Sequence, residues 1–481
     1  FSFTRSAYLD AQLEDLTVSV ENSLWAGRFW LPLRQEIEIR RRAEWLDFPA
    51  RGIIRGRWEI DTYRFNQGLE RSIFLDGRPE IVAAPQAVRD SFPWREGLEA
   101  EVRDIARPAR LQDFAAVREA AAAIAQGHLL SGLRRTQLGG ASVSDFVHMN
   151  RVEGLALGAG GVVRSGDLAT ELRLRLAAAT ATKLFTGGVT GTVRRGTWTV
   201  GAGGYRDVRD FGDLPVIARA TNSLLAQEAG SDYGDYYLAT GGEATLTRAL
   251  GGRTALRLAL GAARIDSLPV VATWARGSYA RPNPGVTEGG WSYLRLGLRR
   301  QASSFAMVRE FSGRAELEGA AFGSGRYGRF YAEGRWQLPV RSGWAVLRGS
   351  VGLATRDLPA HRAFVLGGRG TLLGEGFRAY TGRRSVWLSA DLRLPLTVPE
   401  IPLGSFAGTG RTASLVPFVA AGWTGGGLPG TPGVPAAGPR PVIGLGIEWP
   451  HNLLRLDVGV SPRSGRVGVS IDVSRDFWDI L

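Results

Sequence analysis

The chain has 481 residues, and its formal net charge of +13 comes almost wholly from arginine, since Lys183 is the only lysine. It contains no cysteine, which excludes disulfides, thiolate metal sites and a cysteine nucleophile. No uninterrupted apolar run reaches about 18 residues, so no membrane-spanning helix is expected. The arginines mostly stand singly at alternate positions and do not cluster with aromatic residues, so nucleic acid is not expected as a partner.

Residues 1–95 are predicted to form a β-rich segment. In residues 36–40 and 53–65, apolar side chains alternate with charged ones. This pattern is typical of strands in a sheet with one exposed face. We expect the segment to lie in the periplasm, because the part of the chain that follows it indicates a membrane barrel.

Residues 96–144 are rich in Ala, Glu and Arg, and their apolar residues, such as Phe114, Val117 and Ile124, recur at helical spacing. The pattern predicts two helices broken near Pro108. The apolar stripe fits a packing face or, because it lies close to the barrel, a helix on a membrane surface. Both interpretations remain open at this stage.

From residue 145 to residue 481 the chain alternates between strands and turns. In residues 385–396, leucines such as Leu392 and Leu394 fall on one face, while Arg393 falls on the other. The apolar face is almost purely aliphatic, and the polar face carries Arg, Asp and Gly. This combination predicts an all-β transmembrane barrel with lipid outside and water or a plug inside.

About fifteen candidate strands can be located, and a single-chain barrel needs an even number, so about sixteen are expected. The missing strand is placed between residues 266 and 289, where three prolines interrupt the alternation. Within another connection, residues 217–229 predict a short helix. Long connections of this kind predict one rim of loops opposite a rim of tight turns; they cover residues 211–233, 263–289, 355–384 and 425–439.

A signature-like sequence lies in residues 363–396, AFVLGGRGTLLGEGFRAYTGRRSVWLSADLRLPL. It resembles the signature of the bacterial surface-antigen barrel superfamily, which includes outer-membrane protein-assembly factors and two-partner-secretion transporters. The resemblance implies sixteen strands, a long loop that folds back into the lumen, and a lateral seam between the first and last strands. The residues of its signature turn are Gly367, Gly368, Leu373, Gly374 and Gly382.

The sequence departs from the family pattern at two charged positions. The family's loop arginine falls at Leu373, and its partner acid falls at Ala420. Losing one partner of a buried pair strands a charge, whereas losing both is nearly neutral, so the double change is compatible with the fold. Other charges are candidates to anchor the loop, or are simply solvated lumenal charges: Arg369, Arg378, Asp391, Arg393, Glu448 and Asp457.

No catalytic, cofactor-binding or metal site is expected. The histidines are isolated, and none has a spacing suited to metal ligation. Two glycine motifs, at residues 323–328 and 425–430, do not lie at strand-to-helix turns. Ser142 and Ser144 near His148 form the one close Ser/His grouping, and we do not expect it to be catalytic.

The sequence therefore predicts a non-enzymatic bacterial outer-membrane barrel that translocates, inserts or anchors a polypeptide. The seam is expected between residues 152–163 and 467–473. Outer-membrane lipid is one expected partner; a protein bound through the periplasmic segment or the outer loops is another. Two alternatives stay open: a structural scaffold, favoured because residues 1–145 lack the family's transport-associated repeats, and a simple pore.

Overall fold

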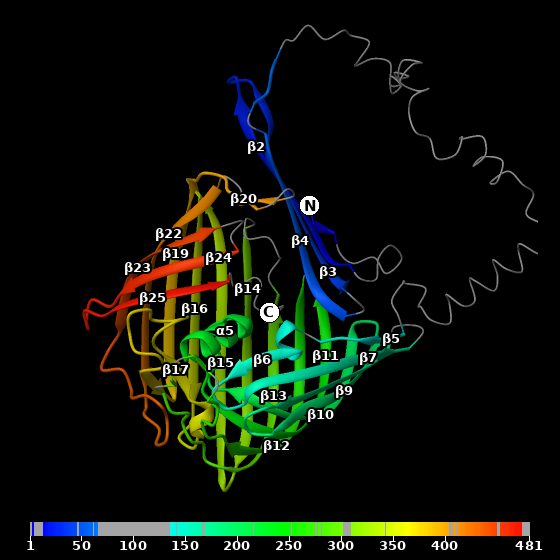
Figure 1. The fold of residues 1–481 in the computed structure, drawn as a ribbon, viewed down its shortest axis with the longest axis vertical. Helices are drawn as coiled ribbons and strands as arrows, with labels where there is room; N and C mark the ends of the chain where they lie inside the picture. Colours follow the sequence, from blue (N-terminus) through cyan, green and yellow to red (C-terminus); the bar gives the residue numbers. More distant parts are fainter. Residues whose placement is uncertain are drawn as a thin grey trace, which may run out of the picture.

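The computed structural model describes residues 2–3, 13–65 and 135–473, apart from short gaps at 46–47, 61, 141, 166–168, 215, 252, 274, 277, 280, 302–308, 342, 404–406, 410–411 and 450–452. They form a small N-terminal sheet and a large closed barrel (Figure 1). The two helices predicted within residues 96–144 fall for the most part outside the described residues, and so do His128 and His451.

The N-terminal sheet is antiparallel, in the order β1 (Ser2–Phe3), β2 (Leu13–Trp25), β3 (Phe29–Trp45) and β4 (Phe48–Glu59). Ala26 and Gly27 adopt left-handed backbone conformations, with φ of 50° and 66°, which matches the twist of a tight hairpin turn. Near this turn the Trp25 ring packs edge-on against Tyr63, at 4.9 Å between centroids. The strand predicted at residues 36–40 lies within β3.

The barrel is a ring of sixteen antiparallel strands. Its first strand is in two pieces, β5 (Thr136–Leu138) and β6 (Val147–Asn150), which both pair with β7 (Gly154–Arg164). The other strands are β8 (Thr170–Ala179), β9 (Phe185–Arg195), β10 (Trp198–Asp210), β11 (Tyr236–Gly251), β12 (Thr254–Ser267), β13 (Gly289–Arg300), β14 (Glu310–Phe322), β15 (Gly325–Val340), β16 (Gly343–Ala354), β19 (Arg384–Thr397), β22 (Thr412–Gly425), β23 (Arg440–Trp449), β24 (Leu454–Val460) and β25 (Val467–Val473).

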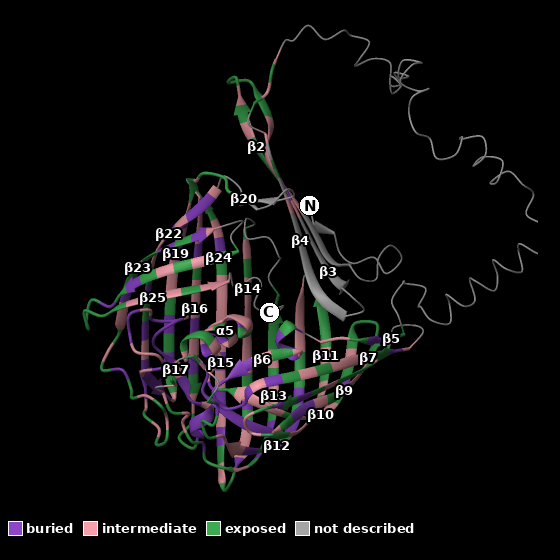
Figure 2. Cartoon of the chain, in the orientation of Figure 1, coloured by how far each residue is buried: buried purple, intermediate pink, exposed green. Residues whose placement is uncertain are grey.

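The two faces of the barrel wall differ as the alternation predicts. Leu456 and Val458 of β24 are 45% and 41% exposed on the outer surface, whereas Asp391 and Arg393 of β19 are buried on the inner side. Figure 2 shows exposed positions alternating with buried or half-buried ones along the barrel strands. The aliphatic rows therefore face outward and the charged rows face the lumen.

Charged residues on neighbouring strands pair across the inner wall. Arg295 lies directly opposite Glu318 in the β13–β14 register, with 2.5 Å between Nε and Oε2. Arg455 lies opposite Glu448, with 3.1 Å between Nη1 and Oε1. Opposite charges on directly facing residues stabilise a strand pair, so these pairs help to fix the register.

The predicted number of strands is confirmed, but the predicted place of the missing strand is wrong. The described part of residues 268–288 contains no strand. Prolines there cannot donate to a ladder, and Asn283 instead donates to the backbone oxygens of Tyr236 and Leu268, both at 2.7 Å. The strand that sequence reasoning overlooked is the divided first strand, which begins at Thr136, ahead of the expected boundary at residue 145.

One α-helix occurs among the described residues, α5 (Arg219–Ala229), in the connection between β10 and β11, as predicted for residues 217–229. Two short 3-10 helices, η1 (Val143–Asp145) and η2 (Ala360–Arg362), also occur there. It ends at Gly230, whose left-handed conformation (φ 60°) is the usual helix stop. Over the described ranges, no helix combines the length and apolar character needed to cross a membrane.

Candidate functional site: a plugged lumen and a latched seam

The long connection between β16 and β19 folds into the barrel and plugs it. It contains η2 (Ala360–Arg362) and a small hairpin of β17 (Phe364–Leu366) with β18 (Tyr380–Gly382). Leu366 and Leu372 of this connection are buried, and they pack in one apolar cluster with Trp387 of β19 and Ala420 of β22. We call residues 355–383 the plug loop.

Three glycines of the signature turn adopt backbone conformations in the plug loop that other residues rarely adopt. Gly367, Gly368 and Gly374 have φ of 120°, 73° and 104°, in the region that favours glycine. Gly382 is required by space instead, because a Cβ there would lie 2.4 Å from the backbone oxygen of Gly425.

Leu373 and Ala420 occupy the positions where the resemblance places an ion pair, and both lie in apolar surroundings. Leu373 lies over Gly459 and Gly468 of the last two strands, and a Cβ added at either glycine would lie 3.1 Å from the leucine side chain. Ala420 is buried in the cluster around Leu372. Neither position leaves a charge without a partner, which agrees with the double loss being tolerated.

Two arginines of the plug loop reach acids elsewhere in the barrel. Arg369 forms an ion pair with Asp472 of β25, at 3.3 Å. Arg378 bonds both carboxylate oxygens of Asp210, at 2.8 and 2.6 Å, and also Asp235, at 3.0 Å. These acids are not those that the sequence suggested.

The acids suggested by the sequence pair with the barrel wall instead. Asp391 binds Arg348 at 2.6 Å and Arg455 at 3.0 Å. Glu448 binds Arg393 and Arg455, both at 3.1 Å, and Asp457 binds Arg455 at 2.9 Å. The reason is alternation: these side chains all point to the lumen from β16, β19, β23 and β24, so wall arginines reach the carboxylates without help from the plug loop.

A cluster of three arginines and three aspartates, buried except for Asp210 and Arg281, joins the loops at the rim; we call it the rim clamp. Its members are Arg151, Arg281, Arg378, Asp210, Asp232 and Asp235. Asp235 has no exposed surface and binds Arg151 and Arg378 at 3.0 Å each, and also Arg281. The clamp therefore ties the β6–β7 turn to the plug loop and to two further loops.

The arginines of the rim clamp differ in how their charge is balanced. Burial lowers the pKa of Arg281 in spite of the neighbouring Asp235. Burial also acts to lower the pKa of Arg378, but Asp210 and Asp235 outweigh it, so the pKa lies above its ordinary value. Both guanidiniums stay charged at neutral pH, since the ordinary pKa of an arginine side chain lies above about 12.

The first strand is broken where the seam lies, so the expected seam residues 152–163 are wrong. They include the β6–β7 turn and most of β7, the second strand, whose edge is already covered by β5 and β6. Between β5 and β6 the chain departs from the strand pairing with β7 and forms the 3-10 helix η1 (Val143–Asp145). Gly158 of β7 makes room for it, because a Cβ there would lie 2.2 Å from the backbone oxygen of Asp145.

Helix α5 and the residue before it bond to both sides of the seam. On the first-strand side, Ser223 Oγ accepts the Met149 N–H at 3.0 Å, and Arg219 donates to Ser142 Oγ at 3.0 Å. On the last-strand side, the Ala218 N–H donates to the Asp472 carboxylate at 3.3 Å. We call α5 with these contacts the seam latch; Figure 1 shows α5 beside β6.

The Ser/His grouping serves structure in this fold. His148 Nδ1 lies 2.8 Å from the backbone oxygen of Ser144, and Nε2 lies 3.2 Å from Glu153. The Ser142 hydroxyl accepts from Arg219. Both ring nitrogens are thus engaged by groups other than a serine hydroxyl, and a serine–histidine nucleophile would need that contact.

Sequence reasoning missed the rim clamp and the seam latch. The stretch SDYGD at residues 231–235 supplies two of the clamp's aspartates, and its Asp/Gly spacing was the available signal. Among the described residues, no group of His, Asp and Glu is arranged to hold a metal ion.

No protein-family model and no curated protein matches this sequence. Solved structures of bacterial barrels do match over 68% of the chain, at low identity. BamA from Haemophilus ducreyi lacking POTRA domains 1–3 is 13% identical with a TM-score of 0.46, and 68% of that chain is covered. CdiB from Acinetobacter baumannii is 15% identical with a TM-score of 0.37, and CdiB from Escherichia coli is 12% identical with a TM-score of 0.38.

The match spans 58% and 60% of the two CdiB chains, less than two thirds of their length. The likeness to these three proteins concerns the fold alone. The class of protein rests on the strand pairings themselves, which define a sixteen-stranded antiparallel barrel with a plugged lumen.

Proposed function

We propose that this chain is a non-enzymatic outer-membrane barrel that translocates, inserts or anchors a polypeptide, with the seam latch holding its lateral seam closed at rest. The observation that carries the proposal is the combination of a plugged lumen with a seam joined through side chains. A plug blocks the axial route, so a polypeptide would use the lateral one.

The outer surface supports a membrane location. Aliphatic side chains at alternate positions are exposed around the ring, as in Leu174, Leu260, Leu294, Leu388 and Ile443. Soluble monomers rarely expose contiguous apolar patches above a few hundred Å². A barrel with such a surface is stable in lipid or detergent, because its strands close into a ring and the aliphatic rows face acyl chains.

The divided first strand supports the seam as the part that opens. The ladder of the first strand is interrupted between β5 and β6, and the latch consists of a few hydrogen bonds from Ala218, Arg219 and Ser223. Regions with few backbone hydrogen bonds and few buried apolar contacts open at the lowest free energy. The free energy needed to open the seam is therefore lower than that needed to separate any of the long strand pairs.

A disulfide lock tests the proposal, since the chain has no cysteine of its own. The substitutions Met149→Cys with Ser223→Cys, and Ala218→Cys with Asp472→Cys, tie α5 to both sides of the seam. The full-length protein is placed in liposomes, an unfolded outer-membrane barrel polypeptide is added, and its rate of insertion is measured. We expect acceleration by the wild type, loss of acceleration on oxidation of the double lock, and recovery on reduction.

A matched control places a disulfide within the loops but away from the seam. Thr381→Cys with Thr431→Cys joins two hydroxyl positions that lie 2.9 Å apart, and this pair should leave the acceleration intact. An oxidised double lock as active as the wild type would contradict the proposal.

Two features of the sequence support the scaffold alternative. Residues 1–145 lack transport-associated repeats, and Leu373 and Ala420 replace the family's loop ion pair. It predicts no acceleration by the wild type, together with a stoichiometric protein partner that co-purifies from native membranes. A simple pore predicts large steady conductance in planar bilayers, which the buried plug loop opposes.

A further inference from the structure

Five arginines form a continuous arc on the inner wall, one on each of the adjacent strands β12 to β16. We call Arg257, Arg299, Arg314, Arg335 and Arg348 the arginine arc. Arg299 lies directly opposite Arg314, and Arg335 lies directly opposite Arg348. Like charges on directly facing residues destabilise a strand pair, so this arrangement needs a compensating negative charge.

The arc lines a cavity of about 840 Å³ inside the barrel. Parts of the long loops form its floor, including Leu214, Gly370 and Leu373. Its opposite end is lined by Arg299, near the end of β13, and by Ser312, near the start of β14. The cavity is therefore a vestibule at the end of the barrel away from the long loops.

Acids of the barrel wall balance three arginines of the arc. Arg314 pairs with Glu333 at 2.7 Å, and Arg348 pairs with Asp391 at 2.6 Å. Arg257 pairs with Glu243 while keeping half of its side-chain surface exposed. Even within these pairs, the arc therefore keeps positive charge in contact with the cavity.

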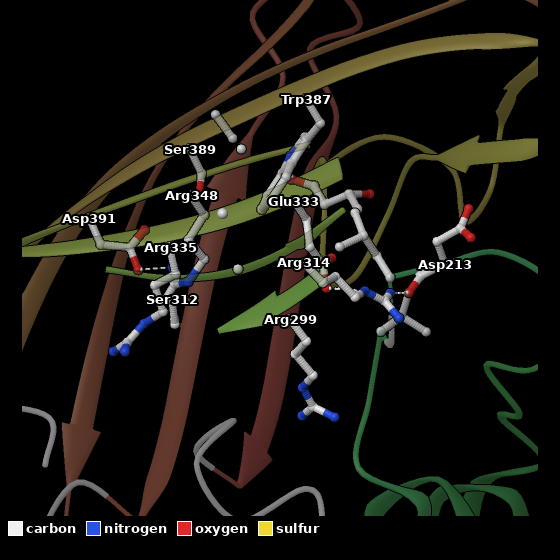
Figure 3. A pocket seen from close by; sticks show the side chains of 18 of the residues that line it. Asp213, Arg299, Ser312, Arg314, Glu333, Arg335, Arg348, Trp387, Ser389 and Asp391 are labelled. Carbon is white, nitrogen blue, oxygen red and sulfur yellow. Dashed lines mark hydrogen bonds and ion pairs between the residues drawn. The ribbon is translucent and has the colours of Figure 1, made fainter. Parts of the chain in front are cut away.

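Arg299 is the arginine of the arc that is most available to a ligand. It is exposed and forms no ion pair with any residue in the described part of the chain. Figure 3 shows Arg299 extending into the cavity, apart from the dashed contacts of Arg314 and Arg348. Arg335 also lines the cavity, and it donates to the neutral amide of Gln337 at 2.7 Å.

We infer that the vestibule binds an extended polyanion: one of its carboxylate or phosphate groups binds Arg299, and the others lie along the rest of the arc. Guanidinium groups bind both kinds of oxyanion in bidentate fashion, which makes arginine the side chain of choice for such ligands. Strands lie about 4.8 Å apart, so the five strands span roughly 19 Å along the wall. A ligand that matches the arc must therefore carry several anionic groups along a chain.

The lining of the vestibule argues against single-stranded nucleic acid as the polyanion. Proteins that bind it stack successive bases on exposed aromatic rings. The aromatic residues that line the cavity are Trp387 and Phe418; Trp387 is buried in the apolar cluster of the plug loop, and Phe418 packs against it. A chain that needs charge alone, without stacking, fits this wall better.

Binding of two defined probes to the full chain in detergent tests the inference. The probes are a short oligoglutamate peptide and inorganic tripolyphosphate, and affinity is measured by titration calorimetry at low and high salt. We expect saturable binding that weakens with salt. The variant Arg299→Gln should weaken it by roughly tenfold, the effect of one lost charge-assisted hydrogen bond.

The matched control is Arg276→Gln, which removes the same charge from an exposed arginine on a long loop and should leave the affinity unchanged. Protection of Arg299 from phenylglyoxal by the bound probe, read by mass spectrometry on the wild type, gives a second measurement that needs no substitution. Saturable binding of oligoglutamate alone supports a polypeptide carboxylate source, and of tripolyphosphate alone a phosphate source. Lack of saturable binding by either probe, or equal affinity in Arg299→Gln, overturns the inference.

Discussion

The rim clamp and the arginine arc are built from the same side chain but place it in opposite environments. In the clamp, Arg151 and Arg378 are 1% exposed and each binds two aspartates. In the arc, Arg299 faces the open vestibule and has no ion partner among the described residues. The clamp thus satisfies each charge within the protein, whereas the arc leaves charge available to a ligand.

This difference has energetic consequences. Removing one partner of a buried ion pair costs about 3–5 kcal/mol, because the remaining charge stays desolvated. Removing a solvent-exposed charge changes stability by less than about 1 kcal/mol. The same residue type should therefore dominate stability at the rim and contribute almost none in the vestibule.

The largest effect is expected from Asp235→Asn in the rim clamp. Asp235 faces three arginines, so neutralising it leaves three positive charges against the two remaining aspartates, Asp210 and Asp232. We expect the free energy of unfolding to fall by about 3–5 kcal/mol, measured by urea titration in detergent. The control is Asp357→Asn, at an exposed position, and a loss for Asp235→Asn as small as the control's would refute the role of the clamp.

A smaller effect, dependent on pH, is expected from His361 in the plug loop. Its ring is buried against Tyr237 and Phe322, and neither ring nitrogen has a hydrogen-bond partner among the described residues. Burial, and then the neighbouring Arg362, lowers the pKa of His361 to about 3. An unfolded histidine titrates near pH 6.5. Below that pH the unfolded chain binds a proton at this residue and the folded chain does not, so acid lowers the free energy of unfolding.

This contribution to stability is therefore complete above pH 6.5 and is lost as the pH falls toward 3. Between pH 6.5 and 4.5 the loss amounts to about 2 kcal/mol. His361→Phe keeps the aromatic packing and should remove this part of the pH dependence, seen as the difference between the two unfolding profiles. Parallel profiles for the wild type and His361→Phe would show that the histidine binds a proton equally well in both states, and would contradict the prediction.

The next effect concerns the plug loop's attachment. Gly382→Ala places a methyl group 2.4 Å from the Gly425 oxygen, so the backbone must shift, and we expect a loss of about 2 kcal/mol. Gly319→Ala on β14 is the matched control, because nothing lies within 4 Å of its added Cβ. The measurement is the thermal transition of each variant in detergent, and equal transitions would mean that the plug loop tolerates the shift.

The smallest effect on stability is expected from Arg299→Gln in the arginine arc. The substitution removes a charge that lies opposite Arg314, so stability should stay within about 0.5 kcal/mol of the wild type or rise slightly. A loss as large as that of Asp235→Asn would erase the distinction between the two regions. Urea unfolding of Arg299→Gln and Asp235→Asn under the same conditions measures the two changes in stability on one scale.

Sequence patterning was sufficient for the barrel wall, because burial on one face imposes a period of two that a single strand already displays. Leu392 and Arg393 could be assigned to opposite faces without any knowledge of their neighbours. The helix at residues 217–229 was also readable, since its pattern is local. The divided first strand was not, because β5 is three residues long and the interruption depends on how η1 packs on Gly158.

The ion pairs of the lumen and the rim also show what a local sequence pattern can and cannot predict. The sequence alone determined the outward aliphatic rows, the inward charges, the glycines of the plug loop and the absence of cysteine. Which acid meets which arginine was decided only by tertiary structure: Arg378 reaches Asp210, more than a hundred residues away, rather than the nearby Asp391. The reason is that an ion pair depends on the distance between side chains brought together by barrel closure, and no local period records that distance.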